Sequence, residues 1–200
     1  MKTSLFAMVI ACFSGPLMAQ PGDDVPAGWW QVGTPGAGYV VETAASSFGL
    51  KSVAVHAENA SRTTFGGIGQ AVSAAPYAGS RVQLTAKLKT LEVNGWSGLW
   101  VRLDAEDGRV ITLDNMSDRG VYGTRPWRRQ RVVLDVPEDA VRIVFGAIQN
   151  GSGRTWVDDF EIAPAQPGAV VTAGPSPYGY YNEPVYEQPP MDPENLDFEL

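Results

Sequence analysis

Cysteine is almost missing from this chain of 200 residues, where Cys12 is the only one. It lies in the N-terminal segment 1–19, which has the pattern of a secretory signal peptide, so the exported chain would keep no thiol. Such a chain forms no disulfide, offers no thiolate nucleophile and builds no sulfur-ligated metal site. Its stability in an oxidising compartment must therefore come from a packed core.

Histidine is equally scarce, with His56 as its single representative. A serine triad or a zinc cluster would have to be built around that one imidazole ring. His56 stands in the strand-like alternation of residues 52–58, SVAVHAE, where a lone histidine is most often a surface or structural residue. The sequence therefore favours a structural role for His56 over a catalytic one.

No run after the N-terminal segment is apolar enough to cross a membrane. The segment itself has a positive start at Lys2, a short apolar run over residues 5–13 and a small residue, Ala19, at the expected cleavage point. This predicts a periplasmic or secreted protein that is cleaved after Ala19. An alternative remains open, because VIAC at residues 9–12 resembles a lipoprotein box that would leave a lipid anchor on Cys12.

Positive charge is in short supply, and the formal net charge is −7. Residues 164–200 hold six acidic side chains and no basic one. No basic face emerges of the kind that binds nucleic acid, so no nucleic-acid partner is expected. The arginines that do cluster flank a predicted strand edge, where such a run is usually solvated or paired: Arg125, Arg128, Arg129 and Arg131.

Helical periodicity is also missing between Gly28 and Ile162, where short alternating segments and glycine-rich turns follow one another. The clearest strand is 81–89, whose hydrophobic residues are two apart. Other strands are predicted at 39–45, 52–58, 68–73, 98–104, 110–114, 130–136, 142–148 and 155–162. With no crossover helices, the pattern predicts an all-β fold, a two-sheet antiparallel β-sandwich or jelly roll, over residues 20–163.

Composition changes after this predicted domain. Residues 164–193 are rich in proline, glycine, tyrosine and acids, which is typical of a flexible tail. The last residues, 194–200, instead place Leu196, Phe198 and Leu200 two apart, as a strand does. The sequence therefore predicts that the chain ends on a strand-like segment.

Two stretches carry a resemblance to a known superfamily. VPAGWW at residues 25–30 and RTWVDDFEI at 154–162, taken with ENLDFE at 194–199, resemble the opening and closing strands of galactose-binding-like jelly rolls, the fold of many carbohydrate-binding modules. The part between them, up to residue 159, resembles a domain that recurs in uncharacterised bacterial proteins, alone or attached to regulators and peptidases. The resemblance implies the fold more firmly than any activity, because this fold carries many functions.

The order of these elements differs from that of the superfamily. There the Asn-x-x-Phe-Glu strand comes first, whereas here it lies at residues 195–199. We therefore expect the tail to loop back and supply the missing strand, in cis to its own sandwich or in trans to a neighbouring copy, which would make the chain self-associate. The alternative is a loose terminal motif or a short signal read by a partner.

The resemblance also implies a structural Ca²⁺. In the superfamily, acids from the Phe-Glu strand and the Asp-Asp strand help to hold the ion, so Asp158, Asp159 and Glu199 are the candidate ligands here. Acids at strand ends are otherwise commonly caps for exposed amides. No other cofactor is expected.

Sugar recognition needs flat aromatic surfaces and planar polar side chains. The residues of this kind that cluster in the sequence are Trp96, Trp100, Arg102, Asp104, Asp114, Asn115 and Trp127. Along residues 99–104 the aliphatic side chains take one face of the strand and Trp100, Arg102 and Asp104 take the other, which is the expected ligand-binding face. Packing in the core or at its rim is the alternative role for these tryptophans.

Enzymatic functions have weaker support. Asp104 with Asp114, or Asp158 with Asp159, could form the carboxylate pair of a glycoside hydrolase, although neighbours on a strand point to opposite faces. No nucleophile elbow or phosphate-binding loop is present. The sequence therefore predicts a secreted, non-catalytic module that recognises carbohydrate or another cell-envelope component. A structural protein that associates through its C-terminal strand, or an envelope glycoside hydrolase, is the alternative.

Expressed with its own N-terminus in a bacterium, the protein is expected to be exported and to begin at Gln20, because the small residue Ala19 follows the apolar run at the distance that signal peptidase requires. N-terminal sequencing and intact mass measure this. A lipid-modified N-terminal Cys12 would contradict it and establish the lipoprotein alternative.

Overall fold

The computed structural model describes residues 25–46, 51–173 and 189–200, and nearly all of its regular structure is strand. The strands are β1 (Trp30–Gly33), β2 (Val40–Ala45), β3 (Lys51–Ala57), β4 (Phe65–Ser73), β5 (Arg81–Ala105), β6 (Val110–Asp114), β7 (Val121–Asp135), β8 (Ala140–Asn150) and β9 (Gly153–Pro164). Among these residues the helical structure amounts to one 3-10 turn, η1 (Ala75–Tyr77), and no helix could span a membrane.

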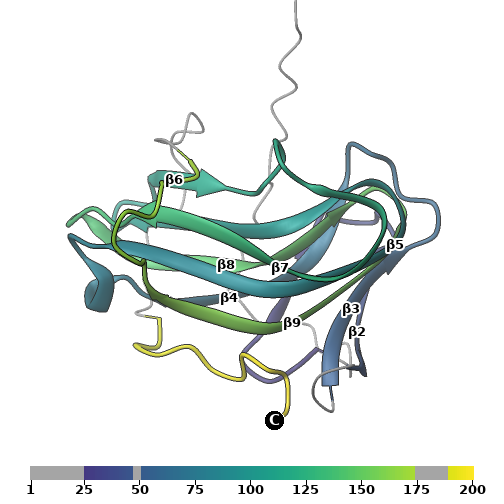
Figure 1. Cartoon of the computed structure of the whole chain (residues 1–200), viewed down its shortest axis with the longest axis horizontal. Helices are drawn as coiled ribbons and strands as arrows, with labels where there is room; N and C mark the ends of the chain where they lie inside the picture. The colour runs from purple at the N-terminus through teal and green to yellow at the C-terminus, as the bar shows by residue number, and fades with distance from the viewer. Residues whose placement is uncertain (1–24, 47–50, 174–188) are drawn as a thin grey trace, which may run out of the picture.

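β5 connects the two layers of the sandwich. Its first half pairs with β7 and β9, and its second half pairs with β8 and β6. The remaining order runs β1-β4-β8-β5-β9-β3-β2, with every pair antiparallel (Figure 1). The strand order confirms the all-β, antiparallel β-sandwich that the alternation in the sequence predicted.

The segments 81–89 and 98–104, predicted as separate strands, are the two ends of this one strand. The residues between them include Asn94-Gly95, a pair typical of turns. Here the register against β7 instead shifts three times along the strand, and Glu92 takes a positive φ of 52°. Irregularities of this kind bend and twist a strand without ending it, which lets β5 pass from one layer into the other.

The main hydrophobic core lies between the two layers. Leu84 and Leu88 enter it from the first half of β5, while Leu99, Leu103 and Phe145 enter from the other layer. All five are at most 1% exposed. Their alternation with outward-facing residues is the period of two that marks a strand buried on one face.

A cluster of four aromatic side chains closes one part of this core. The ring of Trp29 lies 5.7 Å from that of Phe145, 4.8 Å from that of Phe160 and 5.3 Å from that of Phe198, measured between centroids. Tilted and edge-on pairs at such distances are favourable beyond the area that they bury. Because Trp29 precedes β1 and Phe198 is close to the C-terminus, the cluster joins the two ends of the described chain.

The C-terminal segment returns to the body in cis, but the strand-like ending predicted from its alternation is wrong. Figure 1 shows it in yellow along the edge of the molecule next to β9, with no strand assigned. Asn195 and Phe198 have positive φ values of 48° and 59°, so the backbone turns and the period of two is lost. As a result Phe198 is fully buried, whereas Leu200 is 79% exposed.

The ordered body extends beyond residue 163, where the flexible tail was expected to begin. The amide of Ala165 donates to the carbonyl of Arg81 at 2.8 Å, and the Thr172 amide donates to the carbonyl of Val133 at 2.8 Å. The guanidinium of Arg81 also donates to the carbonyl of Ala169 at 2.6 Å. Residues 165–173 therefore continue along β5 and β7.

Replacing Phe198 by alanine is expected to lower the free energy of unfolding by about 3–5 kcal/mol, the usual cost of emptying a buried aromatic site. The matched control is Leu200→Ala, because this exposed side chain should contribute within about 0.5 kcal/mol. Urea denaturation followed by tryptophan fluorescence measures both variants. Equal stabilities of the two variants would contradict the packing described here.

Candidate functional site

Three tryptophans lie on the outer surface of the layer formed by β1, β4, β8 and the second half of β5. We call this surface the tryptophan face and define it by Trp30, Trp96 and Trp100. A separate hydrophobic cluster, distinct from the main core, contains all three rings. Trp100 pairs with Gly146 of β8, and Trp30 pairs with Gly69 of β4. Trp96 and Trp100 of β5 therefore lie on one contiguous surface with Trp30 of β1.

Trp100 is the buried centre of this face. Its indole lies against two glycines: a Cβ added to Gly69 would be 3.0 Å from Trp100 Cζ2, and one added to Gly146 would be 2.9 Å from Nε1. The indole N–H donates to the carbonyl of Ile68 at 3.2 Å. Trp100 is only 5% exposed, so its role is to pack against the sheet. The groups on this face that solvent can reach belong to neighbouring residues.

Trp96 and Tyr122 supply the accessible aromatic surface. Trp96 is half-buried and Tyr122 is 47% exposed. Val121 pairs with Ser97, so Tyr122 and Trp96 both adjoin this pair, at a point where the register of the β5–β7 ladder shifts. Trp96 is held in place by Gly120, where an added Cβ would lie 2.8 Å from the Trp96 Cβ. Together they present two aromatic rings at one end of the face.

A charged group occupies the other end. Asp104, 2% exposed, accepts hydrogen bonds from two arginines. Arg102 Nε lies 2.7 Å from Oδ1, and Arg142 Nη2 lies 2.7 Å from Oδ2. Two guanidinium groups thus share one carboxylate, and the side chain of Arg142 remains 28% exposed. Such charge-assisted bonds fix the planar groups in one orientation and leave an excess of positive charge near the surface.

The other predicted ligand-binding residues lie apart from this arrangement. Asp114, 4% exposed, accepts from Arg119 Nη2 at 2.7 Å and from the Thr172 hydroxyl at 2.5 Å. Asn115 follows it and accepts from the amide of Ser117 at 3.1 Å. Trp127 belongs to β7, next to the first half of β5. The structure therefore brings together Trp96, Trp100, Arg102 and Asp104 of the predicted set.

Sequence reasoning missed Trp30 and Arg142. Trp30 could have been found, because its neighbour Trp29 enters the core and adjacent strand residues face opposite ways. Arg142 had no such signal, because it reaches Asp104 from 38 residues further along the chain.

The three acids proposed as calcium ligands do not converge. Asp158 accepts from the hydroxyl of Ser46 and from the amide of Asp159, while Asp159 forms an ion pair with Lys87. Glu199 Oε1 accepts from the amide of Lys51 at 3.1 Å. Within the described residues no group of three or more acids, histidines or cysteines could hold a metal ion. The side chains in this part of the chain therefore do not fit the Ca²⁺ site that the resemblance implies.

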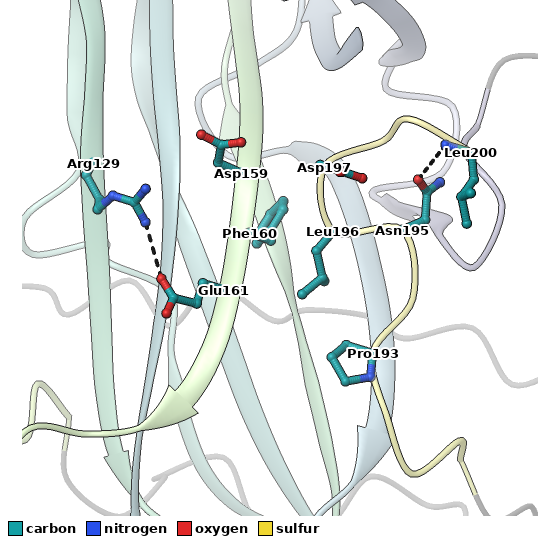
Figure 2. Close-up of a pocket in the computed structure, with 9 residues that line it drawn as sticks. All are labelled: Arg129, Asp159, Phe160, Glu161, Pro193, Asn195, Leu196, Asp197 and Leu200. Carbon is teal, nitrogen blue, oxygen red and sulfur yellow. Dashed lines mark hydrogen bonds and ion pairs between the residues drawn. The ribbon is translucent and has the colours of Figure 1, made fainter. Parts of the chain in front are cut away.

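A shallow hollow of about 530 Å³ separates the C-terminal segment from β9 and β7. Figure 2 shows Leu196 beside Phe160 and, on the body side, the ion pair between Arg129 and Glu161, whose atoms are 3.6 Å apart. Five of the nine lining residues come from the segment, including Pro193. No exposed aromatic ring lines it, so it is a poorer candidate for sugar binding than the tryptophan face.

No family model matches the chain. A stretch of 82 residues is 40% identical to an uncharacterized HTH-type transcriptional regulator, YbfP, of Bacillus subtilis (strain 168). The match covers 41% of this chain and 28% of that protein. The matched stretch therefore spans about a quarter of the length of that relative.

Similar solved structures include the enzymatically active domain of tailspike protein 4 from bacteriophage CBA120, with a TM-score of 0.54 and 12% identity over 70% of this chain and 20% of that one. This likeness concerns the fold alone. The CBM22-1–GH10 modules of Clostridium thermocellum xylanase 10B, in complex with xylohexaose, give a TM-score of 0.49 and 16% identity over 72% of this chain and 27% of that one. TmCBM61 in complex with beta-1,4-galactotriose gives 0.45 and 11% over 70% and 90%. Carbohydrate-binding modules, which the sequence resemblance named, are thus among the structural neighbours.

The buried carboxyl of Asp158 should make stability depend on pH. Burial raises its pKa above the ordinary value of 3.8, against the opposing effect of the Ser46 hydrogen bond. The folded state then binds the proton more tightly than the unfolded state, so this group lowers the free energy of unfolding as pH rises from about 3.8 through the raised pKa. Asp158→Asn removes this dependence.

We expect the stability of Asp158→Asn relative to the native protein to increase across that interval and then level off. Urea denaturation at a series of pH values between about 3.5 and 7 measures the difference, in which the other titrating groups cancel. A difference that stays constant with pH would contradict the burial of an ionisable Asp158.

Proposed function

We propose that this protein is a non-catalytic carbohydrate-binding module that acts outside the cytoplasm, at the cell envelope, and holds its glycan on the tryptophan face. The ligand would lie along the second half of β5, with aromatic stacking at the Trp96 end and charged hydrogen bonding at the Arg142 end. Export rests on the signal-peptide pattern of residues 1–19.

The observation that carries the proposal is that two accessible aromatic residues, Trp96 and Tyr122, adjoin the same point of the β5–β7 ladder. Each is the direct neighbour of one member of the Ser97–Val121 pair, and both rings remain accessible. Flat aromatic surfaces cover the apolar faces of sugar rings, and they do so at low entropic cost when neighbouring groups hold them in place. Trp96 is held in this way by Gly120.

The length and charge of the face favour an extended ligand. Asp104 lies eight positions after Trp96 along β5, which corresponds to about 26 Å of strand. The polar end offers the guanidinium of Arg142, whose geometry suits hydroxyl and carboxylate oxygens. A linear polysaccharide would meet both ends, whereas a monosaccharide would meet one.

The partners of the carboxylates support a binding role over a hydrolytic one. Oδ2 of Asp104 accepts hydrogen bonds from Arg102 and Arg142, Oδ1 lies 2.7 Å from Arg102 Nε, and Asp114 accepts hydrogen bonds from Arg119 and Thr172. A hydrolase needs one carboxyl free to protonate the leaving group and a second directed at the sugar or at water. Both carboxylates are instead engaged by neighbouring side chains of the protein.

Affinity electrophoresis against a panel of neutral and acidic polysaccharides is expected to show retardation by at least one of them. Trp96→Ala and Tyr122→Ala should each weaken that binding about tenfold or more, because loss of a stacking ring removes a major contact. The matched control is Trp156→Ala. Trp156 is also half-buried but lies on β9 in the other layer, between Lys89 and Arg154, so its removal should leave binding unchanged.

Two outcomes would reject the proposal. Retardation that is weakened as much by Trp156→Ala as by Trp96→Ala would place the ligand on the other layer. Release of reducing ends from the retarding polysaccharide by the native protein would instead establish a hydrolase.

A further inference from the structure

The C-terminal segment contacts the body in the way that a bound peptide contacts a receptor. We call residues 189–200 the clasp, and we call the surface beneath it, formed by Ala27, Trp29, Gln70 and Phe160, the clasp groove. The clasp adds no strand to either layer. It is held by hydrogen bonds, several of them to its backbone, and by two buried side chains, Asn195 and Phe198.

Residues of the groove form hydrogen bonds with the backbone of the clasp at several points. Gln70 makes a reciprocal pair with Glu194: its side-chain amide donates to the Glu194 carbonyl at 2.8 Å, and its oxygen accepts from the Glu194 amide at 2.9 Å. Trp29 Nε1 donates to the Asn195 carbonyl at 3.0 Å, and the Phe160 amide donates to the Leu196 carbonyl at 2.9 Å. These bonds fix the register of the clasp.

One side chain anchors the clasp. Phe198 is fully buried and packs against Trp29 and Phe160, with ring centroids 5.3 and 5.9 Å away. Asn195 holds the turn that presents this ring, because its side chain donates to the Ala27 carbonyl at 3.1 Å and accepts from the Leu200 amide at 3.0 Å. A central aromatic anchor with surrounding hydrogen bonds is the usual arrangement of a recognition hot spot.

An empty groove would be costly. Trp29 is 5% exposed and Gln70 is 3% exposed, and without the clasp their polar groups would lose hydrogen-bond partners next to an open aromatic pocket. Removing the clasp would also expose the aromatic surfaces of Trp29 and Phe160, which Phe198 covers, to water. The occupied groove is therefore more stable than the empty one. The clasp that occupies it is attached to the body through a single stretch of chain, residues 174–188.

We propose that the clasp groove is a peptide-binding site that accepts the clasp of a second copy of this chain. None of the contacts above requires the clasp to belong to the same molecule. The fifteen residues of the connection span at most about 50 Å, enough to reach an adjacent copy. The clasp in cis is favoured at low concentration, because a short connection gives it an effective concentration of about 1 mM. Exchange in trans takes over where copies are crowded or where a chain's own clasp is damaged.

The test uses the full-length Phe198→Ala variant and a synthetic peptide of residues 189–200. The variant's own clasp lacks its anchor, so the peptide should bind saturably in calorimetry and raise the melting temperature toward that of the native protein. A peptide in which the residue corresponding to Phe198 is alanine should bind at least about tenfold more weakly. The native protein, with its groove already filled, should show little binding at the same peptide concentration.

A second variant keeps the test valid if Phe198→Ala does not fold. Asn195→Ala weakens the turn but keeps the anchor ring, and it should accept the same peptide. In addition, light scattering after size exclusion should show dimers of the native protein that increase with concentration and are absent from Phe198→Ala.

Saturable binding by either variant together with anchor dependence would support the proposal. No binding to either folded variant at millimolar peptide would overturn it, as would a native protein that stays monomeric at millimolar concentration. This inference is independent of the glycan proposal, because the variants leave the tryptophan face intact.

Discussion

The insertion of Phe198 between Trp29 and Phe160 is the contact on which the closed sandwich depends. It brings the C-terminal residues against the residues that precede β1, and Phe145 from the other layer completes the cluster. A sandwich without disulfides has no covalent means of holding its ends together. Burial of one large aromatic side chain, with the hydrogen bonds around it, takes that role here.

The two outer surfaces of the sandwich have different chemistry. On one surface, Trp100 packs against Gly69 and Gly146, and Trp30 and Trp96 belong to the same hydrophobic cluster. On the other, Trp156 stands among charged groups, with Lys89 Nζ 4.6 Å from the ring centroid. The glycines are the reason for the difference, because they leave room on β4 and β8 for a ring that a side chain would have displaced. The asymmetry makes one surface the better candidate for binding.

Prediction from the sequence succeeded where local pattern decides structure and failed where distant residues do. The alternation around Trp100, Arg102 and Asp104 correctly placed all three on the outer side of β5. The same alternation did not predict that these three side chains are buried, because the residues that cover them, Arg142 among them, come from other strands. Likewise, the spacing of Phe198 within its segment predicted a strand, whereas positive φ values turn the backbone and direct this ring alone into the core.

By itself the sequence determined the class of the fold. Period-two alternation, glycine-rich turns and the lack of helical periodicity leave an antiparallel β-sandwich as the way to bury so many hydrophobic residues. The tertiary structure alone decided that two predicted strands are one, that three proposed metal ligands have separate partners and that the C-terminal segment docks as a turn. Those outcomes depend on which residues meet across long separations in the chain, and alternation within one segment carries no information about its partners.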